Sequence, residues 1–96
     1  METLFIIYDE LFEAQVRGII ERGMVVPRYS RIDSVIGARM VQVQETASYH
    51  TDRRNRMIIA IAEAATIAHL VAELRALRER EGHGLRAFVV PASQVV

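Results

Sequence analysis

The spacing of apolar and polar residues along the chain predicts a regular succession of strands and helices. Residues 4–8 form a continuous apolar run rich in β-branched and aromatic side chains, which indicates a buried strand. From residue 11 the spacing becomes helical, and Gly23 stands where the C-cap of that helix is expected. One face of this helix carries the apolar side chains of Phe12, Val16, Ile19 and Ile20.

The middle of the chain has a weaker pattern. A strand-like stretch runs from residue 24 to about residue 40, with Pro27 near its start. Strict alternation over residues 41–44 is typical of a half-exposed strand or hairpin arm. Residues 48–55 are polar and show no period, so we expect a loop there.

The second half of the chain repeats the order of the first. Residues 57–61 form another apolar run that indicates a strand. A helical stripe follows, made of Ile67, Leu70, Val71, Leu74 and Leu77. Gly82-His83-Gly84 is expected to end this helix, and residues 85–90 form a last predicted strand.

The predicted order β-α-β-β-α-β is that of the ferredoxin-like α+β fold. It places four strands in one antiparallel sheet with both helices on one face, as a single domain of residues 1–96. The first and third strands are apolar at nearly every position, whereas a sheet with one solvated face alternates. We therefore expect the second sheet face to be buried against other copies of the chain.

The charged residues exclude several classes of function. The chain has 12 basic and 12 acidic residues, and every basic residue is an arginine. Without lysine no Schiff base can form, and no P-loop motif is present. A net charge of zero argues against a general nucleic-acid binder, whose affinity depends on neutralising phosphates. We expect no nucleic-acid partner.

Other features of the composition concern chemistry and location. The chain has no cysteine, which excludes disulfides and thiol catalysis. The first residues lack the basic region of a signal peptide, so we expect a cytoplasmic protein. No pair of carboxylates stands out as an acid–base couple, and no catalytic residue is predicted. His50 and Asp52 could supply two metal ligands, which are too few for a site.

A cluster of arginines could bind an anion. Residues 49–56 place Arg53, Arg54 and Arg56 beside hydroxyl and imidazole groups, and guanidinium groups bind phosphate or carboxylate through forked hydrogen bonds. A solvated hairpin tip, with charges that keep the protein soluble, explains this segment equally well. Both interpretations stay open at this point.

Two glycine-containing segments are further candidates. Gly82-His83-Gly84, followed by Arg86, could direct backbone N–H groups and one charge at an anion. A helix cap followed by a turn is the more common explanation for such a segment. Gly37 and Arg39 lie where the long second strand becomes the hairpin arm, and a β-bulge with an exposed arginine explains them as well as a ligand site does.

Four segments that cover most of the chain carry a family pattern. They are residues 6–8 with the first helix and Gly23, Tyr29-Ser30-Arg31 with Val35-x-Gly37, Asn55 before the strand at 57–61, and Gly82-x-Gly84-Leu85-x-Ala87-Phe88-Val89-Val90-Pro91. In these residues the chain resembles the PII-like superfamily of trimeric signalling proteins, in particular its short P-II family nitrogen regulators. The second segment is similar to the stretch that enters the T-loop of that family, and the last to its B-loop and final strand.

The resemblance implies a homotrimer with three ligand clefts between its subunits. Each cleft would hold a small effector, an adenine nucleotide (ADP, AMP or ATP), and bicarbonate is a ligand of some PII-like proteins. The implied binding residues are Gly37, Ala38, Arg39, Arg54 and Arg56 near the T-loop, with Gly82, His83, Gly84 and Arg86 in or beside the B-loop (about residues 82–86). Classical members place lysines on the phosphates, so arginines would take that role here.

The resemblance also implies how the protein signals. The T-loop, here about residues 41–54, would contact a membrane transporter or an enzyme once ligand orders or releases it. The protein would then be a non-enzymatic regulator without a resident cofactor. Two alternatives share the same element order: a trimeric CutA-like protein linked to divalent metals, and an ACT-like module that binds an amino acid.

Overall fold

The computed structural model describes the backbone of residues 1–43 and 46–96, and the side chains of residues 1–35 and 55–96. Its elements are β1 (Glu2–Asp9), the 3-10 helix η1 (Glu10–Phe12), α1 (Glu13–Gly23), β2 (Ser30–Val43), β3 (Thr46–Ala62), α2 (Ala64–Glu81) and β4 (Leu85–Pro91). This is the predicted β-α-β-β-α-β order, with one additional turn of 3-10 helix before α1.

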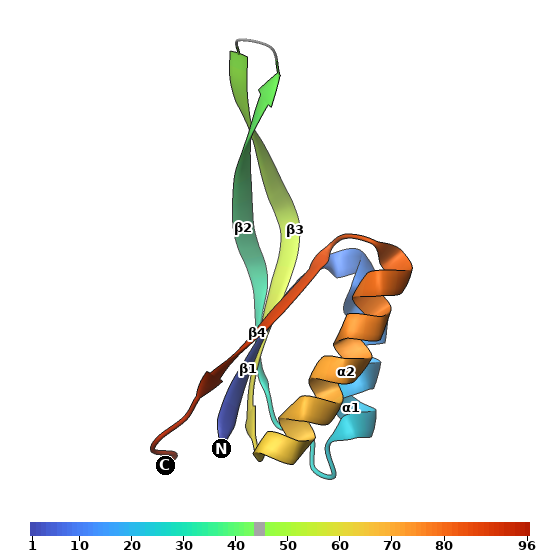
Figure 1. Ribbon diagram of the computed structural model, residues 1–96, viewed down its shortest axis with the longest axis vertical. Helices are drawn as coiled ribbons and strands as arrows, with labels where there is room; N and C mark the ends of the chain where they lie inside the picture. Colours follow the sequence, from blue (N-terminus) through green and yellow to red (C-terminus); the bar gives the residue numbers. More distant parts are fainter. Residues whose placement is uncertain (44–45) are drawn as a thin grey trace.

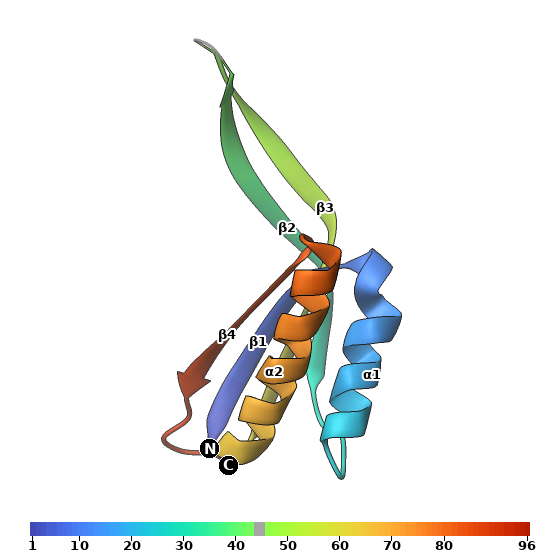
Figure 2. The ribbon, with the colours of Figure 1, turned by 45° about the vertical axis from the view of Figure 1, so that its right-hand side comes forward.

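The strands form one antiparallel sheet in the order β2-β3-β1-β4. Both helices lie on one side of the sheet, and β2 and β3 extend beyond the helices as a two-stranded arm (Figures 1 and 2). The chain ends lie together at the end of the sheet away from the arm (Figure 1). The predicted ferredoxin-like architecture is confirmed.

The core lies between the helices and one face of the sheet. Leu4, Ile6 and Tyr8 alternate along β1 and are buried, because every second side chain of a strand points to the same face. The apolar side chains of the helices pack against these strand residues. The predicted positions Phe12, Val16, Ile19, Ile20, Ile67, Leu70, Leu74 and Leu77 are all buried, and Val71 packs against their edge.

Two sequence-based boundaries were wrong. The strand expected from residue 24 begins only at Ser30, and residues 24–29 form a connection in which Pro27 has no N–H to give to a ladder. The loop expected at residues 48–55 lies instead within β3. Residues 46–54 of β3 lie outside the part that pairs with β1, and only that part belongs to the sheet on which the helices pack.

The sheet face opposite the helices is apolar as well. Phe5 pairs with both Ile59 and Phe88, and residues paired in this way point to the same face. The Phe5 and Phe88 rings stack with centroids 4.9 Å apart. The apolar members of this open face are Phe5, Ile7, Ile32, Met57, Ile59, Ile61, Phe88 and Val90.

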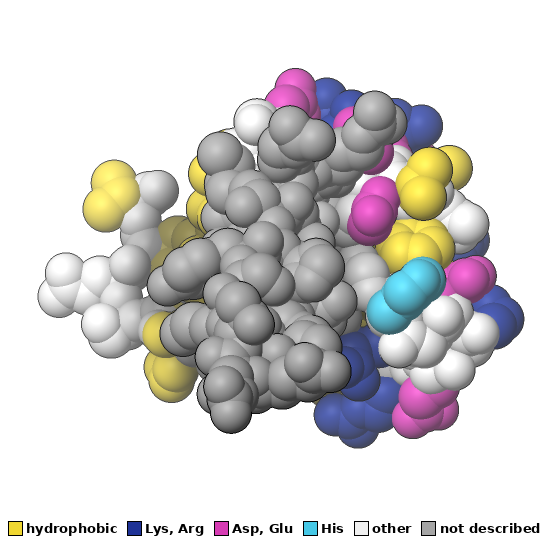
Figure 3. Space-filling view, turned by 90° about the horizontal axis from the view of Figure 1, so that it is seen from above, with side chains coloured by type: hydrophobic (Ala, Val, Ile, Leu, Met, Phe, Trp, Pro, Cys, Tyr) yellow, Lys and Arg dark blue, Asp and Glu magenta, His cyan; other side chains and the backbone are white. Residues whose placement is uncertain are grey.

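Side chains at the edges of this open face remain in solvent in a single chain. Phe88 is 46% exposed, Ile32 43% and Val90 42%. Viewed along the arm (Figure 3), charged side chains of both signs gather on the helix side, whereas the visible side chains on the opposite side are hydrophobic or uncharged. The inference that both sheet faces are apolar is therefore confirmed, and the chain itself covers one of them.

An acidic residue on the open face tests whether another copy covers it. Phe88→Asp should weaken self-association roughly a hundredfold or more (~2.8 kcal/mol), because a carboxylate loses its hydration when an apolar face closes over it. Analytical ultracentrifugation over a concentration series measures this change. The matched control is Val25→Asp, which introduces the same charge at a fully exposed position between α1 and β2. Equal association of the wild type and Phe88→Asp would contradict the inference.

Candidate functional site

The predicted site residues gather at one end of the sheet. β1 ends at Asp9, which pairs with Asn55 of β3, and Asn55 pairs with Val35 of β2. β4 starts at the same end, since Leu85 pairs with Tyr8. The base of the arm and the turn between α2 and β4 therefore share this end of the molecule (Figure 1).

The predicted residues of the arm are located by their backbone register. Gly37 pairs with Asp52, Ala38 with Thr51 and Arg39 with His50. The register shifts between Val35 and Gly37, which is the irregularity that the glycine predicted. The side chains of Arg39, Arg54, His50 and Asp52 lie outside the described residues. Their predicted roles in binding stay predictions.

The turn at Gly82-His83-Gly84 is shaped by the packing of α2 and η1. Gly82 caps α2 in the left-handed conformation (φ 81°), and its N–H donates to the Arg78 carbonyl at 2.7 Å. Gly84 is also left-handed (φ 79°), and a Cβ there would collide with the Phe12 ring. The helix cap and turn are thus established, while the ligand role of these glycines stays a prediction.

The sheet separates two of the predicted arginines. Arg56 pairs with Tyr8, whose side chain is buried on the helix face. Arg86 pairs with Ile7, which belongs to the open face, and Arg86 is exposed. One chain therefore does not bring Arg56 and Arg86 together on the same face.

Arg56 is instead part of a polar cluster centred on Glu13. The Oε1 atom of Glu13 accepts hydrogen bonds from the Tyr8 hydroxyl at 2.7 Å and from Nη1 of Arg56 at 2.9 Å. Its Oε2 atom accepts a hydrogen bond from Nη1 of Arg31 at 3.2 Å, and Arg17 lies 3.8 Å away. One carboxylate thus joins β1, β2 and β3 to the first turn of α1.

Each arginine of this cluster has a second acidic neighbour. Arg31 also binds Asp33 through its Nε atom, and Nη2 of Arg56 lies 3.9 Å from Glu10. The Nε atom of Arg56 is buried, and within the described part of the chain no acceptor bonds to it. The Glu13 side chain is 15% exposed, compared with 34% for Arg31 and 25% for Arg56. The arginines thus keep one edge in solvent.

The surroundings of Glu13 favour its charged form. Burial raises the pKa of the Glu13 carboxyl, but the hydrogen bonds from Tyr8 and Arg56 and the charges of Arg31 and Arg56 outweigh burial, so the pKa lies below its ordinary value. Burial, the hydrogen bond to Glu13 and the charge of Glu13 raise the pKa of Tyr8. At neutral pH the cluster holds an ionised Glu13 and a protonated Tyr8.

Sequence reasoning missed this cluster. The helical spacing places Glu13 on the polar side of α1, where a carboxylate is usually solvated. Tyr8 appeared as one residue of an apolar strand. The signal that could have identified the cluster is the register of β1 with β3, which pairs Tyr8 with Arg56 and which no local pattern specifies.

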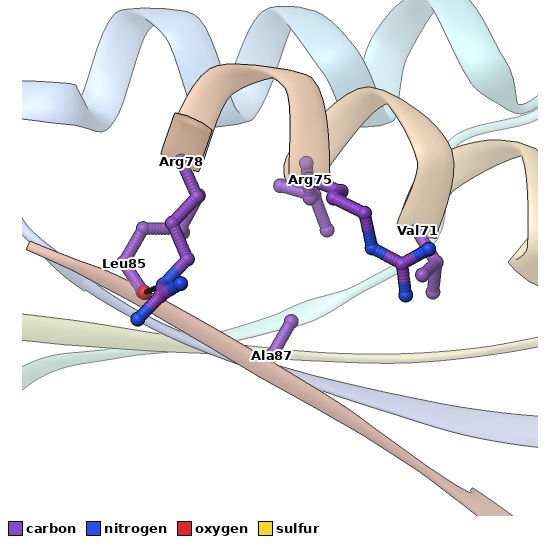
Figure 4. A pocket seen from close by; sticks show the side chains of 6 residues that line it. Val71, Arg75, Arg78, Leu85 and Ala87 are labelled. Atoms are coloured by element: carbon purple, nitrogen blue, oxygen red, sulfur yellow. Dashed lines mark hydrogen bonds between the residues drawn. The ribbon is translucent and has the colours of Figure 1, made fainter. Parts of the chain in front are cut away.

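A shallow groove lies between α2 and β4. It has a volume of about 140 Å³ and is lined by Val71, Leu74, Arg75, Arg78, Leu85 and Ala87 (Figure 4). The Arg78 Nε atom donates to the Leu85 carbonyl at 3.0 Å and ties the last turns of α2 to the start of β4. Small-molecule sites usually have about 300–1,000 Å³, so this groove is too small to enclose a nucleotide.

The part of the chain that the structure describes contains no candidate metal-binding site. No group of three or more His, Cys, Asp or Glu side chains gathers there. His69 is exposed on α2. None of the helices that the structure describes is long and apolar enough to cross a membrane.

The Glu13 cluster makes the stability of the protein depend on pH. Because folding lowers the pKa of Glu13, its contribution is complete above the ordinary value of 4.5 and is lost as the pH falls through the lower folded value. Glu13→Gln should lower the free energy of unfolding by about 1–3 kcal/mol at pH 7, and this difference should shrink in acid. Urea denaturation of both proteins from pH 7 to pH 3 measures it. A difference independent of pH would contradict the assignment.

The fold of this chain is also found in solved structures of other proteins. No family model and no curated protein matches the sequence. The structure of CPII, a nitrogen regulatory PII-like protein from Thiomonas intermedia K12 bound to ADP, AMP and bicarbonate, matches with a TM-score of 0.67 and 18% identity, over 93% of this chain and 82% of that chain. The GlnK–ATP complex of B. subtilis matches with a TM-score of 0.73 and 9% identity, over 93% and 78% of the two chains.

A third match shows the same architecture. A protein from Thermus thermophilus described as a PII-like signalling protein has a TM-score of 0.65 and 16% identity, over 93% of this chain and 83% of that chain. At these identities what is shared is the fold, and it is shared along nearly the whole chain. The chain therefore has the fold of the PII-like signalling proteins.

Proposed function

We propose that this protein is a non-enzymatic PII-like signal-transduction protein, a homotrimer that binds an adenine nucleotide between its subunits. The observation that carries this proposal is the fold, which the chain shares over 93% of its length with CPII bound to ADP, AMP and bicarbonate and with GlnK bound to ATP. Bicarbonate is a second candidate ligand on the same ground. The cytoplasmic location expected from the sequence stays a prediction.

The open sheet face supports the homotrimer. Its apolar side chains come from all four strands, and they include the stacked rings of Phe5 and Phe88. Exposed apolar patches of this kind mark interfaces. A domain of this size is marginally stable alone, so covering the open face would add to its stability. In the proposed trimer the open faces of three copies pack against one another around a common axis.

The end of the sheet that carries the arm base and the α2–β4 turn supports the ligand site. In the proposed site, residues Gly37, Ala38, Arg39, Arg54 and Arg56 come from the arm and its base, and Gly82, His83, Gly84 and Arg86 from the turn and the start of β4. Arg86 lies on the open face beside Ile7, where a neighbouring copy approaches. Guanidinium groups would hold the phosphates, in the role that lysines have in the classical family.

The arm supports the proposed mode of signalling. Residues 41–43 and 46–54 of the expected T-loop (about residues 41–54) belong to the part of β2 and β3 that extends beyond the helices (Figure 2). An arm whose described strands pair with each other can contact another protein without disturbing the core. The proposed target is a membrane transporter or an enzyme whose activity changes when the arm docks.

Nucleotide binding tests the proposal. ADP, AMP or ATP at about 100 times its dissociation constant should stabilise each site by about 2.7 kcal/mol, which a thermal shift detects. Arg86→Ala should weaken binding at least about tenfold (~1.4 kcal/mol), measured by isothermal titration calorimetry, because a charge-assisted contact to phosphate is lost.

Arg80→Ala is the matched control for this experiment. Arg80 is exposed in the last turn of α2, outside the proposed site, and its removal changes the net charge by the same amount. The control should bind nucleotide like the wild type. Absence of binding in the wild type, or equal weakening in both variants, would contradict the nucleotide site.

A further inference from the structure

The Glu13 cluster has the composition of an oxyanion-binding site. Two guanidinium groups and one phenol hydroxyl converge on the two oxygens of a single carboxylate, from Arg31, Arg56 and Tyr8. Arginine forks and hydroxyl donors are the groups that proteins use to bind carboxylates and phosphates. Here the oxyanion is supplied by the chain itself.

Donors remain available in this cluster beyond those that Glu13 uses. The buried Nε atom of Arg56 has no acceptor within the described residues, although a buried N–H normally finds one. Arg31 and Arg56 are 34% and 25% exposed, so an ion from solvent can reach the guanidinium groups without unfolding of the core. The cluster is therefore both under-satisfied and accessible.

We propose that Tyr8, Arg31 and Arg56 form a binding site for a small oxyanion, a carboxylate, bicarbonate or phosphate, and that Glu13 is its built-in competitor. Glu13 occupies the site in this structure. A free oxyanion that takes its place breaks the tie between the first turn of α1 and the two arm strands. This inference concerns the helix face of the sheet; it shares Arg56 with the proposed nucleotide site, but it is argued from the contacts of Glu13 and not from nucleotide binding.

Because the Glu13 carboxylate competes with free anions for Tyr8, Arg31 and Arg56, removal of the Glu13 charge should increase the affinity for anions. In the wild type a free anion must displace a carboxylate held at a high effective concentration by its own chain. In either orientation of the Glu13→Gln amide, its nitrogen faces an arginine N–H, of Arg56 or of Arg31, donor against donor, so the side chain no longer fits the site. The two arginines then lack their shared counter-ion, and an external oxyanion is the group that satisfies them.

The experiment compares the wild type, Glu13→Gln and Glu21→Gln in titrations with formate and with inorganic phosphate at constant ionic strength. Glu21 lies on the same helix, pairs with Arg17 and is 53% exposed, so its variant has the same change in net charge outside the site. The Nε–Hε signals of the arginine side chains in 15N-labelled protein report binding. Formamide, the neutral counterpart of formate, controls for solvent effects.

The expected result is a saturable shift of the Arg31 and Arg56 signals in Glu13→Gln, with a dissociation constant at least tenfold lower than in the wild type or in Glu21→Gln. Arg56→Gln added to Glu13→Gln should abolish that binding, and formamide should have no effect. The relative affinities for formate and phosphate then identify the class of oxyanion. Equal binding in all three proteins, or no saturable shift in Glu13→Gln, overturns the proposal.

A second variant covers the case in which Glu13→Gln does not fold. Glu13→Asp keeps the charge and shortens the side chain by one methylene group, which loosens the internal carboxylate from Arg31 and Arg56. It should bind formate with an affinity above that of the wild type. An affinity equal to that of the wild type would count against the competition as directly as the first result.

Discussion

The structure depends on a central strand that is apolar on both of its faces. β1 lies between β3 and β4, and its alternate side chains enter the core on one side and the open face on the other. Two helices cover one face, which leaves Phe5, Ile59 and Phe88 to be covered by something outside the chain. A 96-residue domain buries a modest fraction of its surface, so this uncovered face matters to its stability. The composition of β1 and its neighbours therefore supports the proposed self-association.

The polar cluster around Glu13 attaches the long arm to the small body of the protein. Residues 36–43 of β2 and 46–54 of β3 belong to strands that pair with each other there, whereas β1 pairs with β3 only over residues 55–62. Glu13 binds Arg31 of β2 and Arg56 of β3, so the first turn of α1 holds both strands within a few residues of the base of the arm. Apolar contacts tolerate sliding, whereas hydrogen-bonded ion pairs demand one geometry. Any ligand that competes for these arginines therefore acts directly on the base of the arm.

The fold could be predicted from the sequence because a buried face imposes a period. The stripe that begins at Phe12 became η1 and α1, and the stripe that begins at Ile67 became α2. The apolar runs at residues 4–8 and 57–61 became the central strands. The arm could not be predicted over residues 48–55, since strands that pair outside the core need no alternation. Its backbone hydrogen bonds hold it extended whatever its side chains are.

The candidate site was predictable in part for a related reason. Gly82 and Gly84 were identified because a left-handed turn needs glycine, a local requirement that is visible in the sequence. The partnership of Arg56 with Glu13 and its separation from Arg86 depend on strand register, which is a property of the whole sheet. The strand register places Arg56 and Arg86 on opposite faces of the sheet, and no sequence motif specifies that register.

Native mass spectrometry with and without ADP tests the central claim, a trimer with nucleotide bound between its subunits, most directly. The account predicts a complex of three times the chain mass of 10.9 kDa that takes up as many as three ADP molecules. A monomer or dimer, or a trimer that takes up no adenine nucleotide under conditions that preserve the fold, would contradict it.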